Sequence, residues 1–189
     1  VIDGVLYGLS PKLVAFALDA ATGSELWRYD PKVAGAAQRG LMYWPKRKTI
    51  FFTAANELIA LNATDGTVVS AFGQDGRLDL RPAGAARSYL AVTVPGVVYE
   101  DNLIFGFSTT EDEHALPGSI RSYSAADGTL QWQFDAIPKI GDPGAETWAE
   151  GSLDRAGGAN AWTGMALDEA RGILFAPTGS ATPDFYGGD

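Results

Sequence analysis

The chain has 189 residues, of which 46% are hydrophobic and 20% charged, a globular composition that excludes an extended disordered chain. Its 23 acidic and 14 basic residues give a formal charge of −9, so we expect no binding to a nucleic-acid backbone. The chain has no cysteine, which excludes disulfides, thiolate metal sites and cysteine nucleophiles.

The first predicted element is a hairpin that recurs along the chain. Each copy consists of an apolar strand, a turn that ends in Gly and a second strand, and the copies are residues 17–27, 60–70 and 122–132. Their glycines, Gly23, Gly66 and Gly128, are separated by 43 and 62 residues. Because Gly tolerates a positive φ, a Thr-Gly or Asp-Gly turn between apolar runs predicts a β-hairpin.

Aromatic residues follow each turn at fixed distances. Trp27 and Trp132 stand four residues after their Gly, where the second copy has Ser70. Two residues further on, every copy has an aromatic residue: Tyr29, Phe72 and Phe134. Side chains alternate along a strand, so both positions lie on the same face of the sheet.

Further short strands are predicted between the hairpins. They are apolar runs bounded by turn residues, at 41–44, 49–53, 94–99, 102–106, 163–167 and 172–176. No long stretch keeps a helical period. A four-stranded unit that recurs about every 40–60 residues is typical of a β-propeller blade. The alternative is an ordinary sandwich with unrelated hairpins, and three copies of one turn motif favour the propeller.

The predicted blades do not close a ring. Residues 1–30 form a partial blade, 39–73 and 90–135 form complete blades, and 161–189 form a second partial blade. Propellers close with about four to eight blades. The first residues have the pattern of the middle of a strand, and the sequence stops abruptly within the segment 186–189. We therefore expect a segment of a longer protein, whose open faces are covered by the remaining blades or by self-association.

Two inner-strand regions predict a ligand site. Residues 42–53 and 165–176 align without a gap, which places Arg39 and Trp162 at the same repeat position, at one end of a central channel. A guanidinium and an indole together suit a flat, anionic, aromatic ligand. The alternative is that Arg39 is a solvated loop charge and Trp162 a packing residue at the rim.

Four segments, in order, resemble the dehydrogenases that depend on pyrroloquinoline quinone (PQQ), in particular the branch of membrane-bound glucose dehydrogenase. Residues 17–30 look like the tryptophan docking motif of that family, and 39–43 are similar to its Arg-Gly-x-x-Tyr segment. Residues 157–162 resemble its Gly-rich approach to an inner-strand Trp, and 176–188 resemble the loop that follows. The pair of adjacent cysteines of methanol dehydrogenases is missing, which favours the glucose-dehydrogenase-like branch.

The resemblance implies an all-β, eight-bladed propeller that holds PQQ over a divalent cation, Ca²⁺ or Mg²⁺. It further implies oxidation of a sugar or alcohol, electron transfer to ubiquinone or a cytochrome, and a periplasmic location, with attachment to the inner membrane through a preceding segment. Arg39 would bind PQQ, Trp162 would form the stacking floor, and Thr178 and Thr182 would lie on the cofactor side. The catalytic Asp of the family would follow Asp189, so we expect no turnover by this segment alone.

Metal ligands are harder to assign. Ser180 lies where methanol-dehydrogenase relatives carry a metal-binding Asn, although a Ser hydroxyl is a poorer ligand for a hard cation. Glu113 belongs to an acidic loop, 109–114, which is either a metal ligand set or a solvated loop tip. We assign no catalytic role to His114, and we interpret Asp184 as a turn residue.

Two further predictions concern a loop and the class of protein. Residues 141–161 form a long irregular insertion, which we expect to wall the channel mouth. The competing function is a non-catalytic scaffold that resembles outer-membrane assembly propellers. A scaffold has no need for the pair of Arg39 and Trp162, so this pair favours the enzyme.

Overall fold

The computed structural model describes residues 1–33, 38–82, 85 and 89–183, and strands dominate it. The helices in this described part are two short 3₁₀ turns, η1 (Pro45–Arg47) and η2 (Ala145–Thr147). No helix of this part is both long enough and apolar enough to cross a membrane. The prediction of an all-β chain is confirmed.

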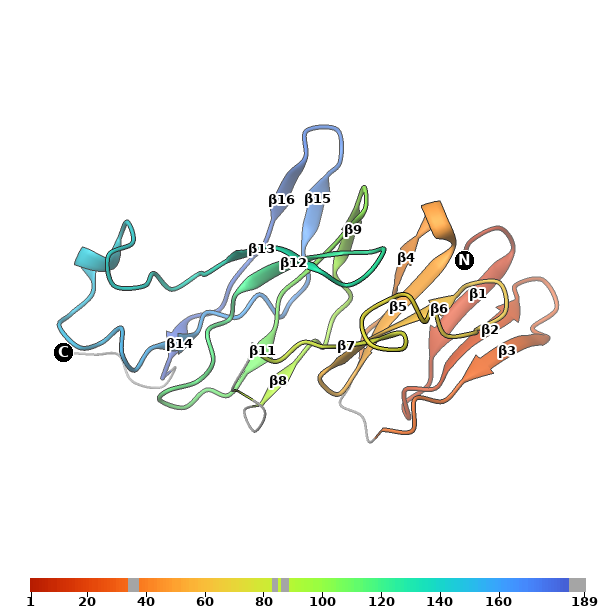
Figure 1. The fold of residues 1–189 in the computed structure, drawn as a ribbon, viewed down its shortest axis with the longest axis horizontal. Helices are drawn as coiled ribbons and strands as arrows, with labels where there is room; N and C mark the ends of the chain where they lie inside the picture. Colours follow the sequence, from red (N-terminus) through yellow and green to blue (C-terminus); the bar gives the residue numbers. More distant parts are fainter. Residues whose placement is uncertain (34–37, 83–84, 86–88, 184–189) are drawn as a thin grey trace.

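Three antiparallel sheets follow one another along the chain, each in a blade-like order (Figure 1). The first sheet consists of β1 (Val5–Leu9), β2 (Ala15–Asp19) and β3 (Glu25–Tyr29). The second consists of β4 (Met42–Trp44), β5 (Thr49–Ala54), β6 (Glu57–Asn62) and β7 (Arg77–Asp79). The third consists of β9 (Val97–Tyr99), β10 (Asn102–Phe105), β12 (Ile120–Ser124) and β13 (Leu130–Phe134). We call them blades 1, 2 and 3.

Short strand pairs complete the structure. The hairpin of blade 3 is extended by β8 (Leu90–Ala91) and β11 (Ser108–Thr109). A fourth unit, blade 4, contains the hairpin of β15 (Ala166–Asp168) and β16 (Ile173–Phe175), and the pair of β14 (Gly157–Gly158) and β17 (Ala181–Thr182). In Figure 1, β4, β9 and β15 run in the same direction, each toward a turn. They are the inner strands that the sequence predicts.

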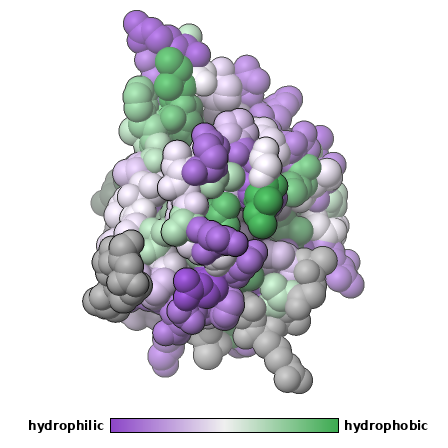
Figure 2. Space-filling model, turned by 90° about the vertical axis from the view of Figure 1, so that its left-hand side faces the viewer, coloured by the Kyte–Doolittle hydropathy of each residue, from purple (hydrophilic) through white to green (hydrophobic). Residues whose placement is uncertain are grey.

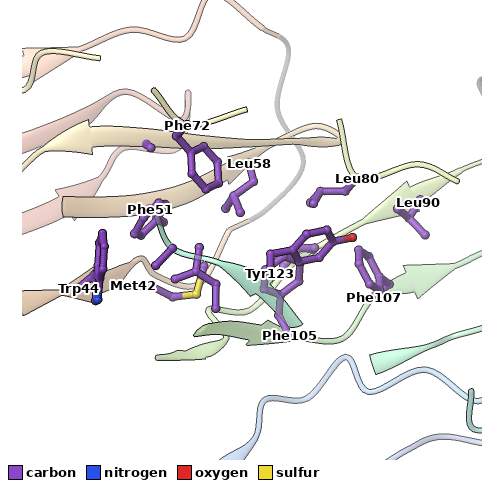
Figure 3. Packing of buried hydrophobic residues seen from close by; sticks show 14 residues of the cluster. Met42, Trp44, Phe51, Leu58, Phe72, Leu80, Leu90, Phe105, Phe107 and Tyr123 are labelled. Atoms are coloured by element: carbon purple, nitrogen blue, oxygen red, sulfur yellow. The ribbon is translucent and has the colours of Figure 1, made fainter. Parts of the chain in front are cut away.

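The core lies between the blades. The largest apolar cluster joins blades 2 and 3 and includes Phe51, Phe72, Phe105 and Tyr123 (Figure 3). A second cluster joins blades 1 and 2, and a third packs blade 3 against β15 and β16. Each blade therefore depends on its neighbours for burial, as expected of stacked repeats.

The turn glycines are the points where blades dock. The ring of Trp27 in blade 1 covers Gly66 in blade 2, and its Nε1–H donates to the Ala63 carbonyl at 2.9 Å. A Cβ on Gly66 would come within 2.6 Å of that ring, and its φ is +72°. In the next joint Phe72 of blade 2 covers Gly128 of blade 3, with ring atoms 3.3 Å from the position of a Cβ. A missing side chain is therefore what lets each aromatic ring approach the turn.

The outer edge of blade 2 differs from the predicted hairpin. Residues 67–70, expected as its second strand, contribute a single bridge between Leu61 and Val68, and the outer strand is β7. The chain reaches β7 through Gly73 and Gly76, which have φ values of +55° and +81°. The two glycines allow a tight excursion that a regular strand does not make. As a result, strand pairing in blade 2 reaches Asp79, beyond the predicted bound at residue 73.

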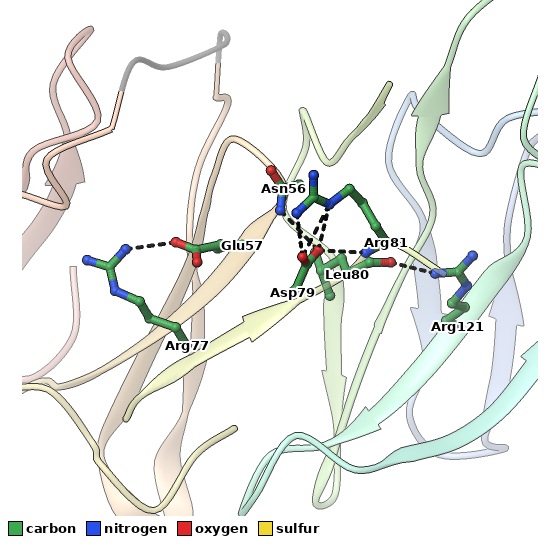
Figure 4. A network of polar contacts seen from close by, with 7 residues as sticks. All are labelled: Asn56, Glu57, Arg77, Asp79, Leu80, Arg81 and Arg121. Carbon is green, nitrogen blue, oxygen red and sulfur yellow. Dashed lines mark hydrogen bonds and ion pairs between the residues drawn. The ribbon is translucent and has the colours of Figure 1, made fainter. Parts of the chain in front are cut away.

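Polar contacts join the blades along their outer edge (Figure 4). Arg77 pairs with Glu57 at 2.7 Å and also donates to Tyr29 of blade 1. Arg121 of blade 3 donates from Nη1 to the Leu80 carbonyl at 2.8 Å, and its guanidinium lies 4.4 Å from the ring centre of Phe107. Arg121 is buried, so this cation is held by a carbonyl and an aromatic face within the joint.

The side of the molecule beyond blade 3 is partly apolar. Along β13, Leu130, Trp132 and Phe134 are exposed, and along β16 so are Ile173 and Phe175. Figure 2 shows this side, with apolar atoms gathered below the polar tip of the topmost projection, at the height of the β15–β16 hairpin. The aromatic residues that are covered in the first two joints therefore have exposed counterparts here.

Candidate cofactor-binding site

The candidate site consists of the segments that lead into the inner strands. Arg39 precedes β4, and its backbone N–H donates to the Thr93 carbonyl, which precedes β9, at 3.1 Å. The guanidinium of Arg39 is exposed, and its Nη1 lies 3.5 Å from the same carbonyl. Arg39 is therefore anchored to blade 3 by its main chain, while its charge faces solvent.

Trp162 lies beside a pair of loops that are hydrogen-bonded to each other. In the pair of β14 and β17, Gly157 is opposite Thr182 and Gly158 is opposite Ala181. The pairing continues through a bond from the Ala159 N–H to the Ser180 carbonyl at 2.8 Å. It ends with the Gly179 N–H, which donates to the Asn160 carbonyl at 3.0 Å. The approach to Trp162 and the loop after β16 therefore form one unit.

The indole of Trp162 is available to a ligand. Its exposed fraction is 46%, and its Nε1 lies 3.8 Å from the place where a Cβ on Gly179 would stand. The neighbouring Ala161 is fully buried, and its carbonyl packs against Gly106 of blade 3. The backbone is thus fixed next to an aromatic surface that the described residues leave half uncovered.

Thr182 provides an unsatisfied polar atom in this unit. The residue is 4% exposed, and its Oγ1 has no hydrogen-bond partner among the described residues. Its Cγ2 packs where a Cβ on Gly158 would stand, 2.6 Å away. A buried hydroxyl without a partner costs free energy unless something binds it. This observation and the exposed indole fit a polar, planar cofactor such as PQQ. Thr178 is exposed in the same loop.

The candidate metal ligands do not form a cation site. Glu113 is exposed and pairs with Arg155 at 3.5 Å, and Ser180 is exposed in the loop after β16. The described residues contain no group of three or more His, Asp or Glu side chains that could hold a metal ion. Glu113 and Ser180, as the structure describes them, therefore do not fit a divalent cation. His114 is exposed, with its backbone N–H bonded to the Arg155 carbonyl.

The inner-strand register corrects the predicted equivalence of Arg39 and Trp162. Trp44 pairs with Thr49 and Asp168 pairs with Ile173, and each pair closes a turn of four residues. Trp44 is thus equivalent to Asp168, one residue beyond the gap-free alignment. In the corrected register Trp162 matches Gln38, and Arg39 matches Thr163.

The remaining site predictions fall into two groups. The structure brings Trp162, Thr178, Ser180 and Thr182 together in blade 4 and places Arg39 in the joint between blades 2 and 3. Asp184 and the following residues of the predicted cofactor loop lie outside the described residues. Sequence reasoning missed Gln38 and Asn160, which hold these segments. In the correct register Gly40 aligns with Gly164, and this match is the signal in the sequence that could have identified the register.

The insertion, predicted as residues 141–161, has a cavity of its own. Its volume is about 410 Å³, and its wall includes Trp148, Glu146 and Asp154. The ion pair of Arg155 with Glu113 ties the insertion to the acidic loop. Its position at the mouth of a channel stays a prediction.

Comparisons with known proteins agree with this arrangement. The family model "PQQ: Glucose/ethanol/alcohol dehydrogenase, beta-propeller domain" matches residues 1–189. Quinoprotein glucose dehydrogenase A of Acinetobacter calcoaceticus is 31% identical, over 92% of this chain and 25% of its own length. Quinohemoprotein alcohol dehydrogenase ADH IIB of Pseudomonas putida is 31% identical, over 96% of this chain and 27% of its own length. The chain thus spans about a quarter of these relatives.

A solved structure gives the same result for the fold. The crystal structure of quinohemoprotein alcohol dehydrogenase from Comamonas testosteroni matches with a TM-score of 0.76 and 26% sequence identity. The match covers 97% of this chain and 29% of that one. The prediction of a partial β-propeller is confirmed.

Proposed function

The chain belongs to the family of PQQ-dependent glucose, ethanol and alcohol dehydrogenase β-propeller domains, and on that premise we propose that it builds part of a PQQ pocket. The observation that carries the proposal is the unit of Trp162 and Thr182, where a half-exposed indole stands in the same loop pair as a buried hydroxyl without a described partner. The indole would stack on the planar cofactor, and the Thr182 hydroxyl would hydrogen-bond to its polar edge.

Arg39 would bind the charged edge of the cofactor. A guanidinium presents planar, paired donors that match a carboxylate. Its exposed side chain, on a main chain that is anchored to blade 3, suits this role. When bound, PQQ supplies the chemistry, because it accepts the electron pair that is removed from the substrate. The residues of this chain orient the cofactor and exclude water from its face.

The finer proposal is a glucose-dehydrogenase-like enzyme that oxidises a sugar or alcohol and passes electrons to ubiquinone or a cytochrome in the periplasm. The absence of cysteine supports this branch, and the Pro-Thr-Gly-Ser loop at 177–180 supports an enzyme over a scaffold. Relatives of both kinds, glucose and alcohol dehydrogenases, match the chain. A Ca²⁺ or Mg²⁺ ion under the cofactor is part of this proposal, with ligands outside the groups described above. The exposed face of β13 would contact further blades or a second copy of the chain.

Equilibrium dialysis against PQQ tests the pocket directly. The wild-type chain should retain PQQ, and Trp162→Ala should abolish retention because the stacking surface is lost. Trp27→Ala is the matched control, since it removes the indole of the first joint and should lower stability without reducing the affinity of the folded fraction. Equal losses of affinity in the two variants at matched folding would refute the division of roles.

Substrate oxidation tests the larger claim. We expect no oxidation of glucose or ethanol by this chain with PQQ, Ca²⁺ and an artificial dye acceptor, because the proposed catalytic base lies outside it. Detectable turnover would overturn this expectation. Binding of PQQ without turnover is the predicted combination.

A further inference from the structure

The segment that carries Arg39 lies along the segment that leads into the inner strand of blade 3, β9. The Gln38 side-chain amide donates to the Val92 carbonyl, and the Arg39 N–H donates to the Thr93 carbonyl. The position of a Cβ on Gly40 lies 3.1 Å from Cγ of Pro95. The main chain of Arg39 is therefore held on both sides by contacts with the neighbouring blade.

Gln38 has a second contact, which ties this joint to the centre of blade 2. Its Nε2 also donates to Oγ1 of Thr53, a residue of β5 that is almost fully buried. The hydroxyl of Thr53 in turn donates to the Val92 carbonyl at 2.9 Å. One amide group thus connects β5, the approach to β4 and the segment between β8 and β9 in blade 3. Loss of this donor removes the link from the approach of β4 to both acceptors, while the bond from Thr53 to the Val92 carbonyl remains.

The guanidinium of Arg39 has weaker restraints than its main chain. It is exposed, and its bond to the Thr93 carbonyl, at 3.5 Å, is at the limit of hydrogen-bond length. The region that the guanidinium can occupy therefore depends on the position of the Arg39 backbone, and the contacts of Gln38 and Gly40 hold that backbone in place.

We propose that Gln38 is a positioning residue for Arg39. Its amide clamps the joint between blades 2 and 3 and so fixes the backbone from which the guanidinium projects. The inference rests on the proposed function, because it takes the cofactor as the group that Arg39 meets. It adds that the affinity of Arg39 for a planar anionic ligand depends on a half-buried amide that does not touch the ligand.

Two variants remove the clamp in different ways. Gln38→Leu replaces the amide with an apolar group of similar length, and Thr53→Val removes the bridging hydroxyl while keeping the side-chain shape. Gln131→Leu is the matched control, because Gln131 is exposed on β13 and bonds only locally, to the Thr129 carbonyl. Urea midpoints identify any variant that fails to fold.

The affinity for PQQ is the first measurement. We expect Gln38→Leu to weaken binding about tenfold, since small displacements of a positioned group reduce its contribution strongly. Thr53→Val should weaken binding in the same direction, and Gln131→Leu should leave it unchanged. In a chain that already carries Arg39→Ala, Gln38→Leu should cost less than about twofold more, because the two residues act as one unit. Full additivity, or no effect of Gln38→Leu, would overturn the proposal.

Amide hydrogen exchange at Arg39 is the second measurement, and it needs no cofactor. Gln38→Leu should speed exchange of the Arg39 N–H, which bonds to Thr93, while Gln131→Leu should not. If the wild-type chain does not bind PQQ, the proposed function fails, and the exchange experiment alone still decides whether the clamp exists. Unchanged exchange in Gln38→Leu would refute the clamp even if PQQ binds.

Discussion

The joint between blades 1 and 2 and the joint between blades 2 and 3 use different aromatic residues for the same task. In the first joint Trp27 covers Gly66 and hydrogen-bonds to the Ala63 carbonyl. In the second, Ser70 stands at the repeat position of the Trp, and Phe72, two residues further on, covers Gly128. In blade 2 residues 70–72 form a turn and not a strand, so Phe72 reaches Gly128 from a turn, whereas Trp27 reaches Gly66 from β3. The turn Gly is therefore the constant element, and the docking aromatic differs in position by two residues between the joints.

The third repeat shows the same positions without a docked partner. Trp132 is 42% exposed, against 8% for Trp27, and Phe134 is 60% exposed, whereas Phe72 is fully buried. The residue types are similar, so the difference in burial comes from the neighbouring blade alone. Four experiments test how the joints and the polar edge of blade 2 contribute to stability.

The largest effect is expected at the second joint. Phe72→Ala should lower the free energy of unfolding by about 3–5 kcal/mol, because it removes a buried ring that packs on Gly128 and on Phe51. Urea unfolding followed by fluorescence measures the change. A loss below about 1 kcal/mol would show that Phe72 is not the docking residue of this joint.

A smaller loss is expected from the acceptor side of the first joint. Gly66→Ala should cost about 2 kcal/mol, since the new Cβ meets the Trp27 ring at 2.6 Å and the backbone has a φ of +72°. Gly23→Ala is the matched control, with a similar φ of +74° and open space around its Cβ. If both variants lose the same stability, the strain comes from the backbone and not from docking.

The polar edge of blade 2 predicts a pH effect. Hydrogen bonds from Arg81 hold the pKa of Asp79 at about 2, below its ordinary value of 3.8. The folded state thus binds the proton more weakly than the unfolded one, and the contribution of Asp79 is present above pH 4 and lost as the pH falls toward 2. Urea midpoints at pH 5 and pH 2.5 should therefore differ less for Asp79→Asn than for the wild type. An identical pH dependence would contradict the assignment.

The smallest effect is expected at Trp132. Trp132→Ala should change the free energy of unfolding by no more than about 0.5 kcal/mol in the monomer, because its indole is half exposed. Trp27→Ala should cost about 3 kcal/mol at the equivalent repeat position. Similar losses in the two variants would mean that Trp132 is covered in solution, and sedimentation would then show whether a second copy covers it.

Local patterns predicted much of the fold. The glycines at 23, 66 and 128 marked the turns. Short apolar runs marked the bounds of β4, β5, β10 and β16 within one residue, and those of β9 and β15 within three. These features are local, so the sequence contains them directly. The outer edge of blade 2 was missed because two positive-φ glycines, Gly73 and Gly76, redirect the chain before pairing resumes.

The candidate site was less predictable. The register of Arg39 and Trp162 was wrong by one residue, because an alignment of apolar residues tolerates a slip that strand pairing does not. Gln38 went unnoticed since its partner Val92 is 54 residues away in the chain, and no local pattern reports that contact. The unpaired hydroxyl of Thr182 likewise results from packing against Gly158. Contacts between blades thus determine what each side chain in the pocket can do.

The pairing of β14 with β17 also determines where blade 4 can change in length. It pairs Gly157–Gly158 with Ala181–Thr182, so residues 159–180 form one excursion of the chain whose two ends are hydrogen-bonded to each other. The tip of the β15–β16 hairpin, residues 169–172, lies within this excursion and is exposed. Residues can be added at the tip without disturbing the pair of β14 and β17. We therefore expect related chains to differ in length at this tip, and a reporter group can be attached there.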